Sequence, residues 1–245
     1  NLPKFLWGRV MKDFSNTEQQ ARLGSYDLPR FHDQKSSRAD TAYTFKRFGK
    51  RAFDISIVLV SIVFVAPIIA FCAVIIALDG GAPFFGHMRV GQNGREFRCW
   101  KIRSMVVDAQ SRLAAHLEAD PEARAEWEAT RKLTNDPRIT RFGQFLRKSS
   151  LDELPQLLNV LLGQMSIVGP RPVPRDELAM YGSSRQAYLA MRPGITGLWQ
   201  VSGRNDVSYA ERIAMDQAYQ KSCSFKLDLV IIFKTFGAVL GRSGR

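Results

Sequence analysis

The sequence predicts a mainly α-helical protein with a small β-hairpin element, seated on a membrane by one apolar helix and by a second helix at the interface. Three observations lead to this fold class. Residues 55–78 form a long uncharged apolar run. Apolar residues alternate on both sides of the turn residues Asn93 and Gly94, which is typical of a hairpin. The spacing i, i+3, i+4 and i+7, which is typical of one face of a helix, is found for Leu154, Leu157, Leu158 and Leu161.

The composition fits one folded domain with an anionic partner. The chain has 245 residues, of which 45% are hydrophobic, and a formal net charge of +12. This length supports one substantial core, or one core with an appended segment. The positive charge predicts binding to nucleic acid, to anionic lipid or to phosphorylated substrates.

The number and spacing of the cysteines and histidines argue against several kinds of site. The three cysteines are widely spaced, without a zinc motif, and their odd number argues against a disulfide framework. The three histidines are scattered, so a bound metal is expected on carboxylates and phosphates, as for Mg²⁺. The sequence has no P-loop and no GxGxxG, HExxH or GxSxG motif.

We divide the chain into three regions by composition. Residues 1–45 are a polar N-terminal lead-in without a sustained period. Residues 46–79 hold a basic segment, expected as an interfacial helix, and the apolar run. Residues 80–245 form the main domain.

The apolar run is long enough for a bilayer core of ~30 Å. Basic residues lie on both of its flanks, although such an excess marks the cytoplasmic side. A helix that enters and leaves by the same face satisfies both flanks. Pro67, preceded by Ala66, lies near the middle, where a proline can bend a helix. We therefore expect a re-entrant helix, with the reservation that spanning helices also tolerate proline.

The main domain reads as helices joined by turn-rich segments. The hairpin is expected around Gln92, Asn93 and Gly94. Residues 106–133 predict a solvated helix that Pro121 interrupts. The apolar stretch at the C-terminus is too short to span a bilayer and suits the interface. The expected elements that remain are a helix at 176–191, a glycine-rich loop at 192–206, a helix at 209–220 and the interfacial helix at 225–241.

Two adjacent carboxylates, Asp152 and Glu153, stand where a helix is expected to begin near residue 151 or 152. Ser150 and Glu153 match a capping box, which would explain the acids structurally. The alternative is a phosphate or metal site at the positive end of the helix. In that case the helix dipole, Arg147 and Lys148 would keep the acids ionised.

Two arginines lie in loops that present side chains rigidly. Arg171 stands between two prolines, and its planar guanidinium suits phosphate. A surface turn with an incidental arginine is the alternative. Arg204 follows Trp199 and Gln200 in a loop that could hold a nucleotide.

The chain carries, in this order, "KRAFD" before the apolar run, "FRCWKIRSM", "SLDELPQL" followed by "VGPRP", and "RPGITGLWQVSGRN". Motifs in this order resemble the bacterial sugar transferase family, the monotopic polyprenyl-phosphate phosphoglycosyl transferases. The resemblance extends over residues 46–242. It is strongest to the small undecaprenyl-phosphate hexose-1-phosphate transferases that initiate exopolysaccharide synthesis.

The resemblance implies roles for individual residues. Asp152 would be the nucleophile, and Glu153, with Asp152, would bind Mg²⁺. The family bends its re-entrant helix at a Ser-Pro pair, so Ala66 and Pro67 lack the hydroxyl of that pair. Phosphate or substrate would be bound by Arg147, Arg171, Arg204, Lys101 and Arg103.

The implied reaction transfers a hexose-1-phosphate from a UDP-hexose, galactose or glucose first, to undecaprenyl phosphate. It would pass through an aspartyl-phosphosugar and release UMP. The catalytic domain would lie at the cytoplasmic face of the bacterial inner membrane, against anionic lipids, and a homodimer is compatible with it. Alternatives are a metal-dependent lipid-phosphate hydrolase and a non-enzymatic membrane scaffold. Nucleic acid is not expected, because the basic residues cluster beside the apolar run.

Overall fold

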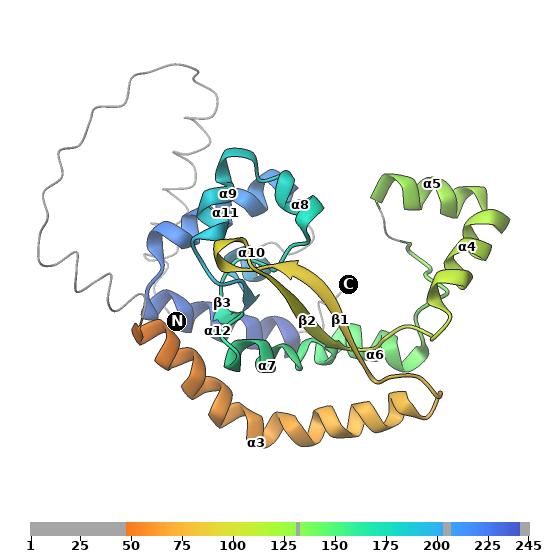
Figure 1. The fold of residues 1–245 in the computed structure, drawn as a ribbon, viewed down its shortest axis with the longest axis horizontal. Coiled ribbons are helices and arrows are strands. Elements are labelled where there is room, and N and C mark those ends of the chain that lie inside the picture. The colour runs from red at the N-terminus through yellow and green to blue at the C-terminus, as the bar shows by residue number, and fades with distance from the viewer. Residues whose placement is uncertain (1–47, 131–132, 203–206, 241–245) are drawn as a thin grey trace, which may run out of the picture.

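The computed structural model describes residues 48–130, 133–202 and 207–240. The lead-in at 1–45 and the predicted site residue Arg204 lie outside these residues. The described chain is mainly helical, as predicted, and carries the small antiparallel sheet. One long helix, α3, runs along one side of a body built from the other elements (Figure 1).

Helix α3 (Lys50–Ala77) is long and apolar enough to cross a membrane. Only 11% of its most apolar stretch is buried within the protein, which excludes the core helix of a soluble fold. The helix continues through Pro67. Residues 50–54 form its first turn, continuous with the apolar run, and the interfacial position expected for this basic segment stays a prediction.

The predicted hairpin is confirmed. Strands β1 (Phe84–Val90) and β2 (Glu96–Ile102) pair antiparallel around the single turn η2 (Gln92–Gly94). Asn93 has φ 58° and Gly94 has φ 77°. Asparagine and glycine enter this left-handed region at the lowest cost, so the residues that predicted the turn also form it.

The break predicted at Pro121 is confirmed as well. Helix α4 (Ala109–Ala119) ends there and α5 (Pro121–Thr130) begins. The Asp120 carboxylate accepts hydrogen bonds from the backbone N–H groups of Glu122 and Ala123 at 2.9 and 3.0 Å. This cap and a proline in the first turn fix the start of α5. The two helices form an arm that projects from the body beyond α6 (Figure 1).

The segment with the acid pair folds as three short helices. Helix α6 (Arg141–Ser149) is followed by the 3₁₀ turn η3 (Leu151–Glu153) and by α7 (Gln156–Leu161). The α-helix expected from residue 151 or 152 therefore begins later, at Gln156. Ser150, with φ 57°, is the cause, because its left-handed conformation ends α6 and turns the chain.

The C-terminal third contains a second sheet that the sequence did not reveal. Strands β3 (Ser166–Val168) and β4 (Gly194–Thr196) pair in parallel, so the expected loop at 192–206 holds a strand and helix α10 (Leu198–Ser202). The helix expected at 176–191 is divided at Gly182, with φ 49°. Its parts are α8 (Arg175–Ala179), η4 (Gly182–Ser184) and α9 (Arg185–Leu189). The last two helices, α11 (Tyr209–Ser222) and α12 (Phe225–Leu240), agree with the prediction.

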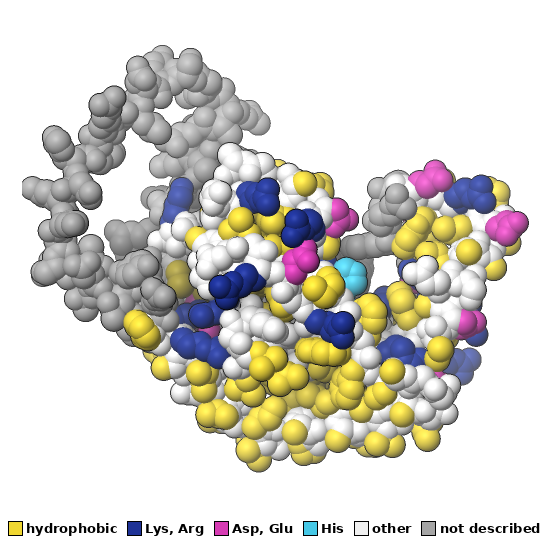
Figure 2. Space-filling view, viewed as in Figure 1, with side chains coloured by type: hydrophobic (Ala, Val, Ile, Leu, Met, Phe, Trp, Pro, Cys, Tyr) yellow, Lys and Arg dark blue, Asp and Glu magenta, His cyan; other side chains and the backbone are white. Residues whose placement is uncertain are grey.

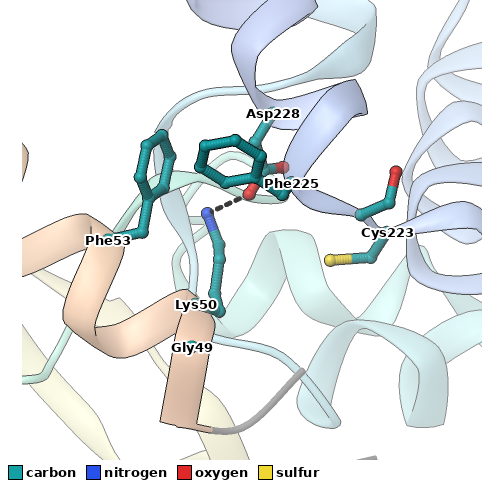
Figure 3. Close-up of a pocket in the computed structure, with 7 residues that line it drawn as sticks. Gly49, Lys50, Phe53, Cys223, Phe225 and Asp228 are labelled. Atoms are coloured by element: carbon teal, nitrogen blue, oxygen red, sulfur yellow. Dashed lines mark ion pairs between the residues drawn. The ribbon is translucent and has the colours of Figure 1, made fainter. Parts of the chain in front are cut away.

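Charged residues in the first turns of α3 fasten it to the body. Lys50 Nζ lies 2.7 Å from Asp228 Oδ2 of α12 (Figure 3). It also lies 3.2 Å from Asp54 Oδ1. Asp54 also accepts hydrogen bonds from the Ser166 hydroxyl at 2.8 Å and the Ile167 N–H at 3.2 Å. These contacts link α3 to α12 and β3 through groups that are almost fully buried.

Arg51 joins the same end of α3 to the helix that follows the acid pair. Its guanidinium donates hydrogen bonds to the carbonyl oxygens of Val160 and Leu161, at the C-terminus of α7. A cation suits that position because the last carbonyls of a helix have no partner within it. Of the basic residues before the apolar run, Lys50 and Arg51 thus turn toward the body of the protein.

Asp216 of α11 is a buried acid that has no cationic partner among the residues that the structure describes. It accepts a hydrogen bond from the Tyr181 hydroxyl at 3.0 Å, within a cluster of tyrosines. Burial raises its pKa to about 7, although the hydrogen bond from Tyr181 opposes this. The protonated form is therefore favoured in the folded state.

We predict that Asp216 makes the protein less stable as the pH rises. Its pKa is raised on folding, so its stabilising effect is complete at low pH and is lost as the pH rises through about 7. Between about pH 4 and about pH 8, wild type should lose up to about 4 kcal/mol relative to Asp216→Asn. Thermal unfolding across this range measures the difference. Exposed Asp176→Asn is the control, and parallel curves for wild type and Asp216→Asn would contradict the prediction.

Candidate active site

The acid pair lies on the single turn η3, between α6 and α7. Asp152 is buried and Glu153 half-buried. The Ser150 side chain makes no capping hydrogen bond, so the capping box is wrong. The Glu153 N–H instead donates to the Ser150 carbonyl oxygen. The acids therefore do not serve to cap a helix, and their burial has to be explained otherwise.

Lys101 of β2 contacts both acids. Its Nζ lies 2.6 Å from Glu153 Oε1 and 3.8 Å from Asp152 Oδ2. The hairpin brings it there, since β2 packs against η3. The lysine that neutralises the acids is therefore Lys101, whereas Lys148, the neighbour in sequence, is exposed.

The two carboxylates differ in proton affinity. Burial raises the pKa of Asp152, with Glu153 adding to the rise and Lys101 and Arg147 opposing it. Burial also disfavours the charged form of Glu153, but Lys101 and Arg171 outweigh it and hold its pKa below the usual value. Asp152 therefore holds a proton more readily than a free aspartate does, whereas Glu153 holds one less readily. One acid has gained basicity and its neighbour keeps its charge.

Arg147 lies on the Asp152 side of the pair. It comes from the last turn of α6, and its Nε donates to the Ser104 hydroxyl at 2.8 Å. Helix α6 approaches Ser104 closely because residue 143 is glycine, and a Cβ there would overlap the Ser104 carbonyl. Among the described residues its other guanidinium nitrogens have no hydrogen-bond partner, so they could bind an anion near Asp152.

Arg171 and a second arginine lie on the Glu153 side. Arg171 is exposed in the loop after β3, and its charge lowers the pKa of Glu153. Arg89 of β1 acts on Glu153 in the same way. Sequence reasoning did not select Arg89. The alternation of side chains along the hairpin could have identified Arg89, because it places Arg89 on the same face as Lys101.

The structure does not bring every predicted residue to the pair. Arg103 turns to the other end of α3, where it donates to Asp79 at 2.9 Å and to the Ile76 carbonyl oxygen at 3.1 Å. Arg204 lies outside the described residues. A small pocket between Lys50, Phe53 and Phe225 (Figure 3) includes neither carboxylate of the acid pair.

The acid pair fits Mg²⁺ only together with a substrate. Among the described residues, no group of three or more His, Cys, Asp or Glu side chains could hold a metal. Mg²⁺ commonly binds through one or two carboxylates and the phosphates of a substrate. Glu153 and Asp152 could supply those carboxylates, and a diphosphate the remaining ligands.

A long apolar helix fastened to a body that carries an acid pair and basic side chains is typical of a membrane-associated protein that binds phosphate groups. The chain belongs to the bacterial sugar transferase family, whose model matches residues 45–242.

Three relatives illustrate the similarity. The UDP-galactose-lipid carrier transferase of Erwinia amylovora is 53% identical over 198 residues, which are 81% of this chain and 42% of that protein. The exopolysaccharide production protein ExoY of Sinorhizobium fredii is 50% identical over 192 residues, 78% of this chain and 85% of ExoY. The undecaprenyl-phosphate galactose phosphotransferase of Salmonella typhimurium is 50% identical over 198 residues, 81% of this chain and 42% of that protein. The chain thus spans less than half of two of these relatives and most of ExoY.

We predict that Lys101→Met raises the pKa of both acids, because Lys101 lowers both. Glu153 should then bind a proton at a higher pH than in wild type. Infrared difference spectra of the carboxyl band, recorded against pH, measure the shift, and Glu153→Gln identifies the band. Lys101→Arg keeps the charge and should titrate close to wild type. Identical titrations of wild type and Lys101→Met would contradict the prediction.

Proposed function

We propose that this protein is a phosphoglycosyl transferase that moves a hexose-1-phosphate from a UDP-hexose to undecaprenyl phosphate. The observation that carries the proposal is a buried Asp152 of raised basicity beside a charged Glu153, between separate basic groups. Family membership and the names of the relatives support the substrate classes. Both relatives are named for galactose, which makes UDP-galactose the first donor to test and UDP-glucose the second.

The first step is attack by the Asp152 carboxylate on the β-phosphorus of the donor. The bond between this phosphorus and the bridging oxygen breaks, and UMP leaves with the electron pair. The product is an acyl phosphate that joins the hexose-phosphate to Asp152. A carboxylate freed from water is a stronger nucleophile, and Lys101 and Arg147 keep it available in its charged form.

In the second step a phosphate oxygen of the lipid attacks the same phosphorus. The acyl phosphate bond breaks, the Asp152 carboxylate is restored and a polyprenyl-diphosphate-hexose is released. The covalent step allows two substrates of different solubility to react one after the other. Mg²⁺, when bound by Glu153, Asp152 and the diphosphate, would supply charge neutralisation.

We further propose that α3 is re-entrant, because both of its ends are fastened to one body. The first turns bind α12 and α7 through Lys50 and Arg51. The last turn binds Arg103, at the end of β2. A helix that crossed the bilayer would place its ends on opposite faces, ~30 Å apart. One body on one face cannot hold both, which supports a monotopic protein at the cytoplasmic face of the inner membrane.

The surface that would meet the membrane extends beyond α3. Hydrophobic side chains gather along the side of the molecule that α3 occupies (Figure 2). Apolar residues near the acid pair are exposed too, namely Phe145 of α6 and Leu158 of α7. Helix α12 exposes Phe233 and Phe236, which suits the predicted interfacial position. This surface would hold Asp152 at the level of the lipid phosphate.

We predict that Asp152→Asn abolishes UMP release from UDP-galactose, even without lipid acceptor. An amide cannot form the acyl phosphate. Purified protein in nanodiscs with Mg²⁺, assayed for UMP, measures this, and Asp108→Asn on the exposed arm is the control. UMP release by Asp152→Asn would contradict the nucleophile. A lipid-phosphate hydrolase would not release UMP from the donor, and a scaffold would keep its function in Asp152→Ala/Glu153→Ala.

We predict that both ends of α3 can be labelled from one side of the membrane. Phe48→Cys and Ala82→Cys place thiols at exposed positions that flank the helix. In sealed inside-out vesicles an impermeant maleimide should label both, and in right-side-out vesicles neither. The unmodified chain corrects for its own cysteines. Labelling of the two sites from opposite sides would contradict re-entry.

A further inference from the structure

Arg89 lies on the face of the hairpin that covers the acid pair. In the antiparallel register, Phe85 pairs with Lys101 and Arg89 with Phe97. Paired residues share a face, as do residues two and four apart along a strand. Because Lys101 reaches Glu153, Arg89 faces the same side of the molecule.

The backbone holds Arg89 beside the loop of Arg171. The N–H of Val90 donates to the carbonyl oxygen of Val173 at 2.9 Å. The Tyr188 hydroxyl strengthens this junction, since it donates to the Val90 carbonyl at 2.7 Å and accepts from the Val173 N–H at 3.2 Å. The two arginines are therefore neighbours because of main-chain pairing and a buried tyrosine.

Within the described part of the chain, neither arginine side chain forms an ion pair or a hydrogen bond, and Glu153 and Glu177 attract Arg89 without contacting it. Arg89 is nevertheless half-buried. Burial is the main cause that lowers the pKa of Arg89, and the charge of Arg171 lowers it further. Two like charges held together without an acid in contact are unfavourable, and an anion bound between them would remove this cost.

The arginines around the acid pair act on different carboxylates. Arg147 acts on Asp152, whereas Arg89 and Arg171 act on Glu153. We propose that Arg89 and Arg171 together bind the phosphate of the nucleoside monophosphate that leaves in the first step. This rests on the proposed function. As the bond to the β-phosphorus breaks, the departing phosphate gains negative charge, and two guanidinium groups already in place stabilise it.

The test is equilibrium binding of UMP to the full chain in nanodiscs, by calorimetry. Arg89→Gln should weaken UMP binding about 10- to 100-fold, the loss expected for hydrogen bonds to a charged group. Arg89→Lys keeps the charge without the planar guanidinium group, so its affinity for UMP should lie between those of wild type and Arg89→Gln. Arg95→Gln, exposed in the turn of the same hairpin, should bind UMP as wild type does. Uridine lacks the phosphate, and its binding should be equal in all four proteins.

Wild-type affinity of Arg89→Gln for UMP would overturn the inference, as would an equal loss for UMP and uridine. Arg89→Gln is compared with wild type only if both unfold at the same temperature. If Arg89→Gln unfolds at a lower temperature, the ratio of UMP affinity to uridine affinity is compared between Arg89→Lys and wild type. An unchanged ratio would then overturn the inference. Failure of wild type to release UMP from UDP-hexose would overturn the proposed function itself. Release by wild type with unchanged UMP binding in Arg89→Gln would overturn the role of Arg89 alone.

Discussion

The buried contact of Lys50 with Asp54 and Asp228 is the interaction on which the remaining structure depends. It fastens the apolar helix to a body that also holds the acid pair. Burying three charges is costly unless each is paired and hydrogen-bonded, and removal of one leaves the others without compensation. Asp54 also binds β3, which leads into the loop of Arg171, and Arg51 binds α7, which follows the acids. The apolar helix and the acid pair are therefore held in place by the same connected set of contacts.

A second constraint is that the two adjacent carboxylates, Asp152 and Glu153, have different surroundings. In water their properties would be nearly alike. The fold places Lys101 at 2.6 Å from Glu153 and at 3.8 Å from Asp152, so the cation favours one acid more strongly. Burial acts on both, but only Asp152 ends with a raised pKa. Environment raises the pKa of one acid and lowers that of its neighbour.

The sequence predicts features that depend on near neighbours and misses those that depend on distant ones. The hairpin follows from Asn93 and Gly94, and the break between α4 and α5 from Pro121. The late start of α7 depends on a left-handed serine, a conformation that sequence seldom reveals. Strands β3 and β4 are too short to show a period and pair across the chain. The contact of Lys101 with Glu153 spans 52 residues, so proximity in sequence selected Lys148 instead. The family resemblance, and not spacing, gave Asp152 and Glu153 their separate roles.

In the proposed mechanism Asp152 becomes covalently joined to a sugar phosphate at the membrane surface. Intact-protein mass spectrometry after incubation with UDP-galactose and Mg²⁺, without lipid acceptor, detects this intermediate. We expect a mass increase of one hexose phosphate, located to the peptide that carries Asp152 and removed when undecaprenyl phosphate is added. Product formation without such an adduct under rapid acid quench, or an adduct on another residue, would contradict it.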